Sequence, residues 1–170
     1  WVGQVTDLDE VKGKTKKKRS WIDRVAGAKA ADEPDARLMR PYGIAGDSQG
    51  RLYVADGFQR QVFVLDLIQH RVEVRGSAGQ ASLALPVGVA LDEKDRLFVS
   101  DSFQRSITCF DPSGRVLSQF GQDQLERPGG IAIDRKRQRL YVADAKAHRV
   151  AVFNTESFTF ERYVGSPSTP

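Results

Sequence analysis

Short apolar runs separated by polar turn residues follow one another along the chain, and their arrangement recurs three times. The first copy, residues 40–66, reads RPYGIAGDSQGRLYVADGFQRQVFVLD. The second copy, residues 85–111, reads LPVGVALDEKDRLFVSDSFQRSITCFD. The third copy, residues 127–154, reads RPGGIAIDRKRQRLYVADAKAHRVAVFN. Because the runs are short, rich in β-branched and aromatic residues and bounded by Gly, Pro or Asp, the pattern predicts strands.

Each copy predicts four strands. The first follows a proline and opens with Gly43, Gly88 or Gly130. We expect it to be the innermost strand, buried on both faces, with glycine permitting close backbone approach. The second and third strands are rich in aromatic and β-branched residues. The fourth is the weakest, as expected of an edge that meets solvent. Its predicted ranges are 71–74, 116–120 and 158–164.

The copies recur at a nearly constant interval, since Pro41, Pro86 and Pro128 are 45 and 42 residues apart. A period of roughly 40–50 residues made only of short strands is typical of a β-propeller with one four-stranded sheet, or blade, per repeat. The sequence therefore predicts an all-β fold that forms part of a propeller ring. The three blades are expected at about 40–84, 85–126 and 127–165.

Three blades are too few to close a ring, because propellers typically have about 4–8 blades. We expect either further blades in a longer chain or a second copy that forms a homodimer. The longer chain is favoured because the sequence starts at Trp1 rather than Met. Residues 166–170 also follow a blade at the point where another Pro-x-Gly run is due. The alternative interpretation of that last segment is a tail.

The runs P-x-G-[IV]-A, [RL]-L-[YF]-V-[AS]-D and [RS]-[VI]-x-[VC]-F-[DN] resemble the NHL repeat and match it three times over residues 40–165. Residues 144–150 come close to the D-x-x-N-H-R-V segment of that family, with Ala147 where Asn is usual. The chain also resembles the first half of bacterial six-bladed NHL proteins. The resemblance implies an extracytoplasmic bacterial protein, in the periplasm or at the cell surface. Such propellers include a metal-dependent lyase class, and their six-bladed cousins include lactonases.

Residues 1–39 differ in composition from the repeats. Residues 1–5 suit a strand, and residues 20–30 suit a short helix because Ser20 and Asp23 resemble a capping box. Between them, six cations outnumber the net charge of +4 of the whole chain: Lys12, Lys14, Lys16, Lys17, Lys18 and Arg19. Such a run is usually solvated, but it also suits nucleic acid or an anionic surface. No aromatic residues alternate with it, as a platform for single strands would require.

Few residues are candidates for catalysis. Only two histidines occur, His70 and His148, so a three-histidine metal site is impossible within the chain. Cys109 stands alone on a third strand and suits a small buried residue. The repeated aspartates, Asp56, Asp101 and Asp144, are expected to accept hydrogen bonds from turn backbone, because a residue present in every copy favours a structural role. We predict no catalytic residue, metal or cofactor here, and an enzyme whose ligands lie outside this chain remains an alternative.

The turns between second and third strands share one end of a propeller with the residues that precede each first strand. Aromatic residues combined with arginine are typical of interface anchors. We therefore predict a non-catalytic scaffolding module that binds a protein partner through this end. The alternatives are nucleic-acid binding through residues 12–19 and part of a metal-dependent enzyme, and no membrane span is expected. The predicted partner-binding residues are Arg40, Tyr42, Phe58, Arg60, Phe103, Arg105, Arg127, Lys146 and His148.

Overall fold

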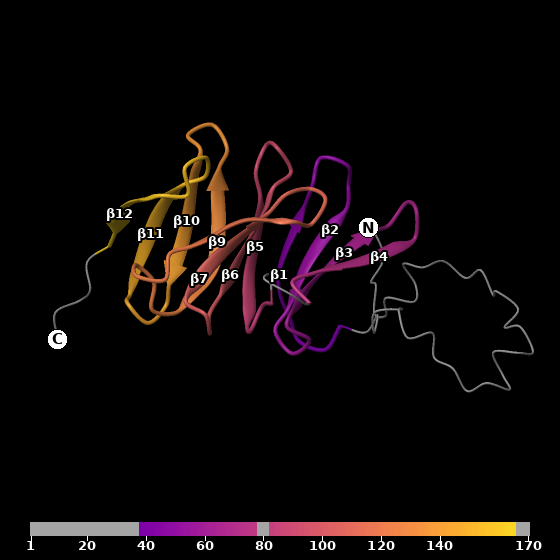
Figure 1. The fold of residues 1–170 in the computed structure, drawn as a ribbon, viewed down its shortest axis with the longest axis horizontal. Helices are drawn as coiled ribbons and strands as arrows, with labels where there is room; N and C mark the ends of the chain where they lie inside the picture. The colour runs from indigo at the N-terminus through magenta and orange to yellow at the C-terminus, as the bar shows by residue number, and fades with distance from the viewer. Residues whose placement is uncertain (1–37, 78–81, 166–170) are drawn as a thin grey trace, which may run out of the picture.

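The computed structural model describes residues 38–77 and 82–165, which form three four-stranded antiparallel sheets (Figure 1). The first contains β1 (Pro41–Gly46), β2 (Leu52–Asp56), β3 (Gln61–Asp66) and β4 (Arg71–Arg75). The second contains β5 (Pro86–Leu91), β6 (Leu97–Asp101), β7 (Ser106–Phe110) and β8 (Val116–Phe120). The third contains β9 (Pro128–Asp134), β10 (Arg139–Asp144), β11 (Arg149–Asn154) and β12 (Phe160–Val164). The predicted N-terminal strand, basic loop and short helix lie outside the described residues.

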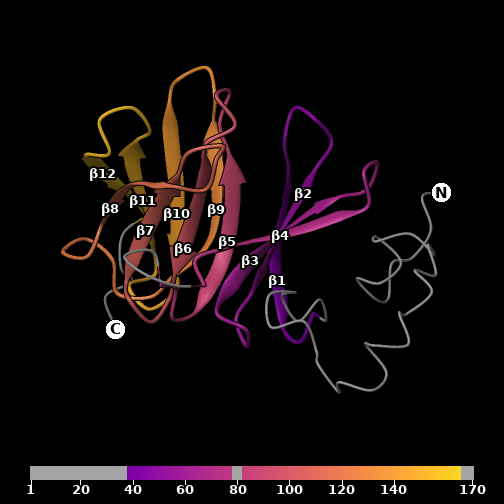
Figure 2. The ribbon, with the colours of Figure 1, turned by 45° about the vertical axis from the view of Figure 1, so that its right-hand side comes forward.

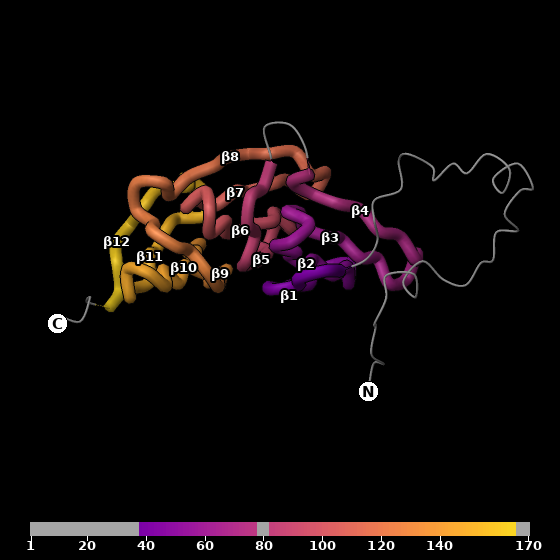
Figure 3. Tube along the Cα trace, turned by 90° about the horizontal axis from the view of Figure 1, so that it is seen from below, coloured from indigo at the N-terminus to yellow at the C-terminus, as the bar shows by residue number. Residues whose placement is uncertain are grey.

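Within each sheet the strands follow one another in sequence order, each paired antiparallel with the next. The sheets lie side by side as successive layers (Figure 2). Seen from below, β1, β5 and β9 line one edge of the array, and β4, β8 and β12 fan outward (Figure 3). The prediction of propeller blades is confirmed. The described part contains no helix that is long and apolar enough to cross a bilayer.

Apolar side chains fill the spaces between neighbouring sheets because strand alternation gives each sheet two apolar faces. Between the first and second sheets, Tyr53 and Val64 join a buried cluster with Val99 and Phe110. Between the second and third sheets, the cluster is larger and more aromatic. It contains Phe98, Ile107, Cys109, Phe120, Leu140, Val142 and Phe153. Each sheet therefore covers its neighbour, and the burial of these side chains holds the stack together.

Glycine allows the innermost strands to approach closely, as the sequence predicts. A Cβ atom on Gly43 would lie 2.6 Å from the carbonyl oxygen of Val87 on β5. A Cβ atom on Gly88 would lie 2.5 Å from the carbonyl oxygen of Gly129 on β9. Gly130 occupies the corresponding position of the third sheet, where no atom lies within 4 Å of the Cβ position. The inner edge of the third sheet thus has no neighbour at Gly130 among the described residues.

Two details of the prediction are wrong. Only β5 is largely buried, whereas β1 is mostly exposed and Ile44 on it is 63% exposed. The reason is that β5 has an inner strand on each side, while β1 has only one among the described residues. The last outer strand starts at Phe160 rather than at 158, because Phe158 has φ 58° within a turn that the Asn154 side chain stabilises.

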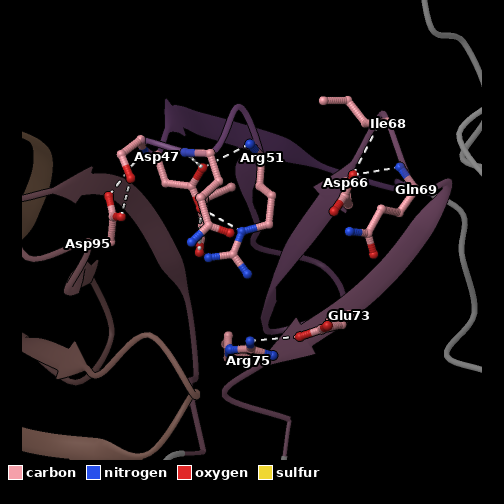
Figure 4. Close-up of polar contacts among 11 residues, drawn as sticks. Asp47, Arg51, Asp66, Ile68, Gln69, Glu73, Arg75 and Asp95 are labelled. Atoms are coloured by element: carbon pink, nitrogen blue, oxygen red, sulfur yellow. Dashed lines mark hydrogen bonds and ion pairs between the residues drawn. The ribbon is translucent and has the colours of Figure 1, made fainter.

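At the end of the stack opposite the turns that contain Asp56, Asp101 and Asp144, other turns are closed by Asp–Arg ion pairs. Asp47 accepts hydrogen bonds from the backbone N–H of Gln49 and from both the backbone N–H and the Nε of Arg51 (Figure 4). Asp92 makes the same contacts with Lys94 and Arg96. The turns also connect sheets, since the Ser48 hydroxyl donates to Asp95 at 2.5 Å. The Ser48–Asp95 contact joins the first and second sheets at this end.

Glu156, in the turn between β11 and β12, connects the third blade to the second. It accepts hydrogen bonds from Lys94 at 2.7 Å and Arg96 at 2.5 Å, both on the second sheet. The Lys94 hydrogen bond, with the nearby Arg96 charge, lowers the pKa of Glu156 below its ordinary value of 4.5. A lowered folded pKa contributes stability above the ordinary value, and this contribution is lost as the pH falls through the folded pKa.

We therefore expect the Glu156→Gln variant to lose less stability than the wild type when the pH drops from neutral to below 4.5. Urea unfolding followed by circular dichroism at several pH values measures this. Glu93→Gln is the matched control, because Glu93 is exposed and forms no ion pair within residues 38–77 and 82–165. If Glu156→Gln and the wild type lose the same stability on acidification, the Glu156 ion pairs do not contribute to the acid sensitivity.

Candidate partner-binding surface

The turns β2–β3, β6–β7 and β10–β11 lie at one end of the stack, along the lower edge of Figure 1. Each turn is joined by a backbone hydrogen bond to the residue that precedes its innermost strand. Gly57 donates to Arg40 at 3.0 Å, Ser102 to Leu85 at 3.0 Å and Ala145 to Arg127 at 3.1 Å. We call this set of turns and entering segments the loop end. Its backbone is therefore the same in all three sheets.

The repeated aspartates hold the loop end together. Asp56 is fully buried and accepts the backbone N–H groups of Met39, Arg40, Phe58 and Gln59 at 2.6–3.0 Å. Asp101 does the same for Ala84, Leu85, Phe103 and Gln104. Asp144 accepts from Glu126, Arg127 and Ala147. Each carboxylate connects a turn to the segment entering the sheet, so its oxygens are engaged with backbone.

Two phenylalanines project from this rigid backbone into solvent. Phe58 is 66% exposed and Phe103 is 78% exposed, at the same position of turns on neighbouring sheets. The backbone N–H of each donates to the turn aspartate at 3.0 Å. In the third sheet Lys146 takes this position. Because large apolar side chains gain free energy on burial, a rigid turn that exposes one is suited to contact another molecule.

Two residues further on, each turn has a residue in the left-handed backbone region. Arg60 has φ 57°, Arg105 has φ 55° and His148 has φ 51°. All three side chains are exposed. This conformation is uncommon for residues other than glycine, so its presence in every copy shows that the turns share one geometry. Each of the first two turns therefore presents a phenylalanine and an arginine in the same relative arrangement.

The other predicted partner-binding residues also lie at the loop end. Tyr42 is 45% exposed, and the Arg40 guanidinium lies 5.5 Å from the centre of its ring. Arg127 is exposed, and Lys146 pairs with Glu126 at 3.1 Å. The nine residues are thus gathered at one end of the stack. The six basic residues at 12–19 lie outside the described residues.

The environment of Arg149 is not evident from the sequence. Its guanidinium lies 3.5 Å from the centre of the Tyr163 ring on β12 and donates to the carbonyl of Gln124 at 3.3 Å. Tyr163 donates its hydroxyl hydrogen to the same carbonyl at 3.0 Å. These contacts fasten the connection between β8 and β9 to the third sheet. The pairing spans up to 39 residues, and a single sequence offers no signal for it.

The groups with catalytic potential are dispersed. His70 lies in the β3–β4 turn at the far end from His148, and both are exposed. In residues 38–77 and 82–165, no group of three or more His, Cys, Asp or Glu side chains is placed to hold a metal ion. Cys109 is fully buried, and burial raises the pKa of its thiol to about 12. The thiol therefore stays protonated and unreactive at neutral pH.

A shallow open groove follows the innermost strands and has a volume of about 330 Å³. Aliphatic side chains, glycine backbone and the Tyr42 ring line the groove. Its lining residues are Tyr42, Gly43, Ile44, Val87, Gly88, Val89, Gly130 and Ile131. These groups offer apolar contacts and backbone hydrogen bonds to a ligand.

The stacked four-stranded sheets define a class, the β-propeller. Residues 125–153 match the NHL repeat. The chain is 31% identical over 124 residues to NHL repeat-containing protein 2 of Gallus gallus, covering 72% of this chain and 13% of that protein. It is 29% identical over 126 residues to the Bos taurus protein of the same name, covering 74% of this chain and 13% of that protein. The chain belongs to the NHL repeat family.

Solved structures share the fold. Virginiamycin B lyase from Staphylococcus aureus superposes with a TM-score of 0.64 at 16% identity, covering 82% of this chain and 44% of that one. Kuenenia stuttgartiensis hydrazine synthase superposes with a TM-score of 0.62 at 18% identity, covering 79% of this chain and 38% of that one. U3-55K superposes with a TM-score of 0.64 at 15% identity, covering 75% of this chain and 40% of that one. The chain spans about an eighth of the length of the curated relatives and less than half of these structures.

Proposed function

We propose that these blades form a non-catalytic interaction module that binds a protein partner through the loop end. One observation carries this proposal: Phe58 and Phe103 are 66% and 78% exposed at equivalent positions of two neighbouring turns. An exposed apolar group that is part of a larger patch marks an interaction site, and these two rings repeat at the same turn position on adjacent sheets. Their neighbours Arg60 and Arg105 add the second residue type that dominates interface hot spots.

The turns are suited to binding because they are already ordered. Each phenylalanine donates its backbone N–H to a buried aspartate that also accepts two or more other N–H groups. A side chain on a fixed backbone loses less conformational entropy when a partner covers it. Two such anchors on adjacent sheets give a partner two points of attachment in a defined orientation.

Replacing Phe58 and Phe103 together by Ala should weaken partner binding at least about tenfold, since each exposed aromatic anchor is removed. The fold should be retained because neither side chain is part of the buried clusters. Affinity purification followed by titration of the purified partner measures the effect, with circular dichroism to confirm the fold.

Ile68→Ala is the matched control. Ile68 is 79% exposed, and its N–H donates to Asp66 at 3.0 Å in a turn at the opposite end of the same sheet. The control should bind the partner as the wild type does. If the Ile68 variant loses the partner and the double phenylalanine variant keeps it, the loop end is not the binding surface.

A further inference from the structure

The two ends of the stack differ in what their acidic residues contact. At the end opposite the loop end, aspartates pair with arginines of the same turn. The distances are 2.6 Å for Asp47–Arg51, 2.6 Å for Asp92–Arg96, 3.2 Å for Asp111–Arg115 and 2.8 Å for Asp134–Arg137. Each of these arginines thus has part of its guanidinium engaged by an aspartate of its own turn.

At the loop end the three repeated aspartates contact backbone alone, with no arginine partner. Asp56, Asp101 and Asp144 lie buried beneath the surface and accept turn N–H groups. As a result, Arg60, Arg105 and Arg127 form no ion pair with any acidic residue of the described ranges, although all three are exposed. Their guanidinium groups therefore face solvent with their donors available to another molecule.

Available guanidinium groups favour a carboxylate partner. The planar group forms two parallel hydrogen bonds to a carboxylate, which are shorter and stronger than neutral ones. The buried aspartates offset part of the long-range field of the surface cations. Selectivity for the partner therefore depends on direct arginine–carboxylate pairs at short range rather than on electrostatic attraction at a distance.

The cation and the apolar group belong to one unit. Phe58 and Arg60 are two residues apart in a turn of fixed geometry, and Phe103 and Arg105 repeat the unit on the next sheet. We propose that the partner of the loop end presents an acidic peptide segment in which carboxylates accompany large apolar side chains. The segment lies across the β2–β3 and β6–β7 turns, with one acidic and one apolar contact at each. This inference rests on the proposed function of the loop end and adds the chemistry of the partner.

A random peptide library displayed on phage and selected on the purified chain tests the proposal. Peptides enriched on the wild type should be acidic and contain Phe, Leu or Trp. For a synthetic fluorescent peptide of the enriched sequence, R60E/R105E should weaken binding at least about tenfold, measured by anisotropy. R135E/K136E is the matched control, because it makes the same charge change at exposed residues of the β9–β10 turn at the opposite end. That variant should bind within about twofold of the wild type.

The other outcomes overturn the inference. Enrichment of neutral or basic peptides, or of none, contradicts an acidic partner, and so does an equal loss in R135E/K136E. If neutral apolar peptides bind and F58A/F103A abolishes their binding while R60E/R105E does not, the partner chemistry is wrong but the loop end remains the binding surface. If a fluorescent oligouridylate binds through Arg60 and Arg105 and no acidic peptide does, the surface recognises nucleic acid. If neither double variant affects the peptides selected, both the inference and the proposed function fail.

Discussion

Replacing Asp101 by Ala should lower the free energy of unfolding by about 3–5 kcal/mol. Its carboxylate is fully buried and accepts the N–H groups of Ala84 at 2.6 Å, Leu85 at 3.1 Å, Phe103 at 3.0 Å and Gln104 at 2.9 Å. Alanine leaves these donors without their acceptor, and buried donors without a partner are costly. Two of the donors precede β5 and two belong to the β6–β7 turn. The entry to the middle sheet and the turn should therefore loosen together.

Urea unfolding at neutral pH measures this loss. Asp101→Asn keeps one oxygen acceptor but places an amide N–H₂ against N–H donors, so it should lose about half as much stability as alanine. Asp123→Ala is the control, because Asp123 is exposed and accepts no hydrogen bond within the described part of the chain; it should stay within about 0.5 kcal/mol of the wild type. An Asp101→Ala protein as stable as the Asp123→Ala protein would contradict the structural role.

Most of the fold could be predicted from the sequence because a repeat specifies it three times. The proline of each first strand, the turn aspartate and the apolar pattern between them locate strands to within a residue or two. The prediction failed where neighbours decide the outcome. Ile44 on β1 is exposed because β1 has an inner strand, β5, on one side only among the described residues, and no local pattern reveals that. Phe158 lies in a turn because Asn154 accepts the N–H groups of Glu156 and Ser157, as Asp66 accepts those of Ile68 and Gln69 in the β3–β4 turn.

The candidate site was predictable in its composition but not in its charge pairing. The positions of Phe58 and Phe103 follow from the repeat. Whether an arginine is paired does not, because Arg51 and Arg60 have similar sequence neighbourhoods and only Arg51 meets a carboxylate. Spacing does not separate the two cases: Asp47 and Arg51 recur as Asp92 and Arg96 four residues apart, but Asp56 and Arg60 are also four residues apart and form no ion pair. The contact from Arg96 to Glu156 spans 60 residues and becomes visible only when the sheets are stacked.

Gly88→Ala should destabilise the protein by about 1–3 kcal/mol or more, because the new Cβ would overlap atoms that cannot move away. The position of that Cβ atom is 2.5 Å from the carbonyl oxygen of Gly129, 2.9 Å from the Ser100 hydroxyl and 3.0 Å from the backbone nitrogen of Ile131. Ser100 also accepts the Gly88 N–H at 2.8 Å and donates to the Gly129 carbonyl at 2.5 Å, so displacing it breaks two more contacts. The innermost strands β5 and β9 would have to separate. Thermal and urea unfolding measure the loss.

Gly130→Ala is the matched control, because Gly130 has the same place on β9 and nothing within 4 Å of its Cβ position. It should be neutral to within about 0.5 kcal/mol in this chain. A loss as large as that of Gly88→Ala would show that another inner strand already lies against β9, whether from a second copy or from further chain. In a longer protein that places a fourth sheet there, the same substitution should become as costly as Gly88→Ala. Comparing the two alanine variants in a shorter and a longer chain therefore tests both the close approach of inner strands and the continuation of the stack.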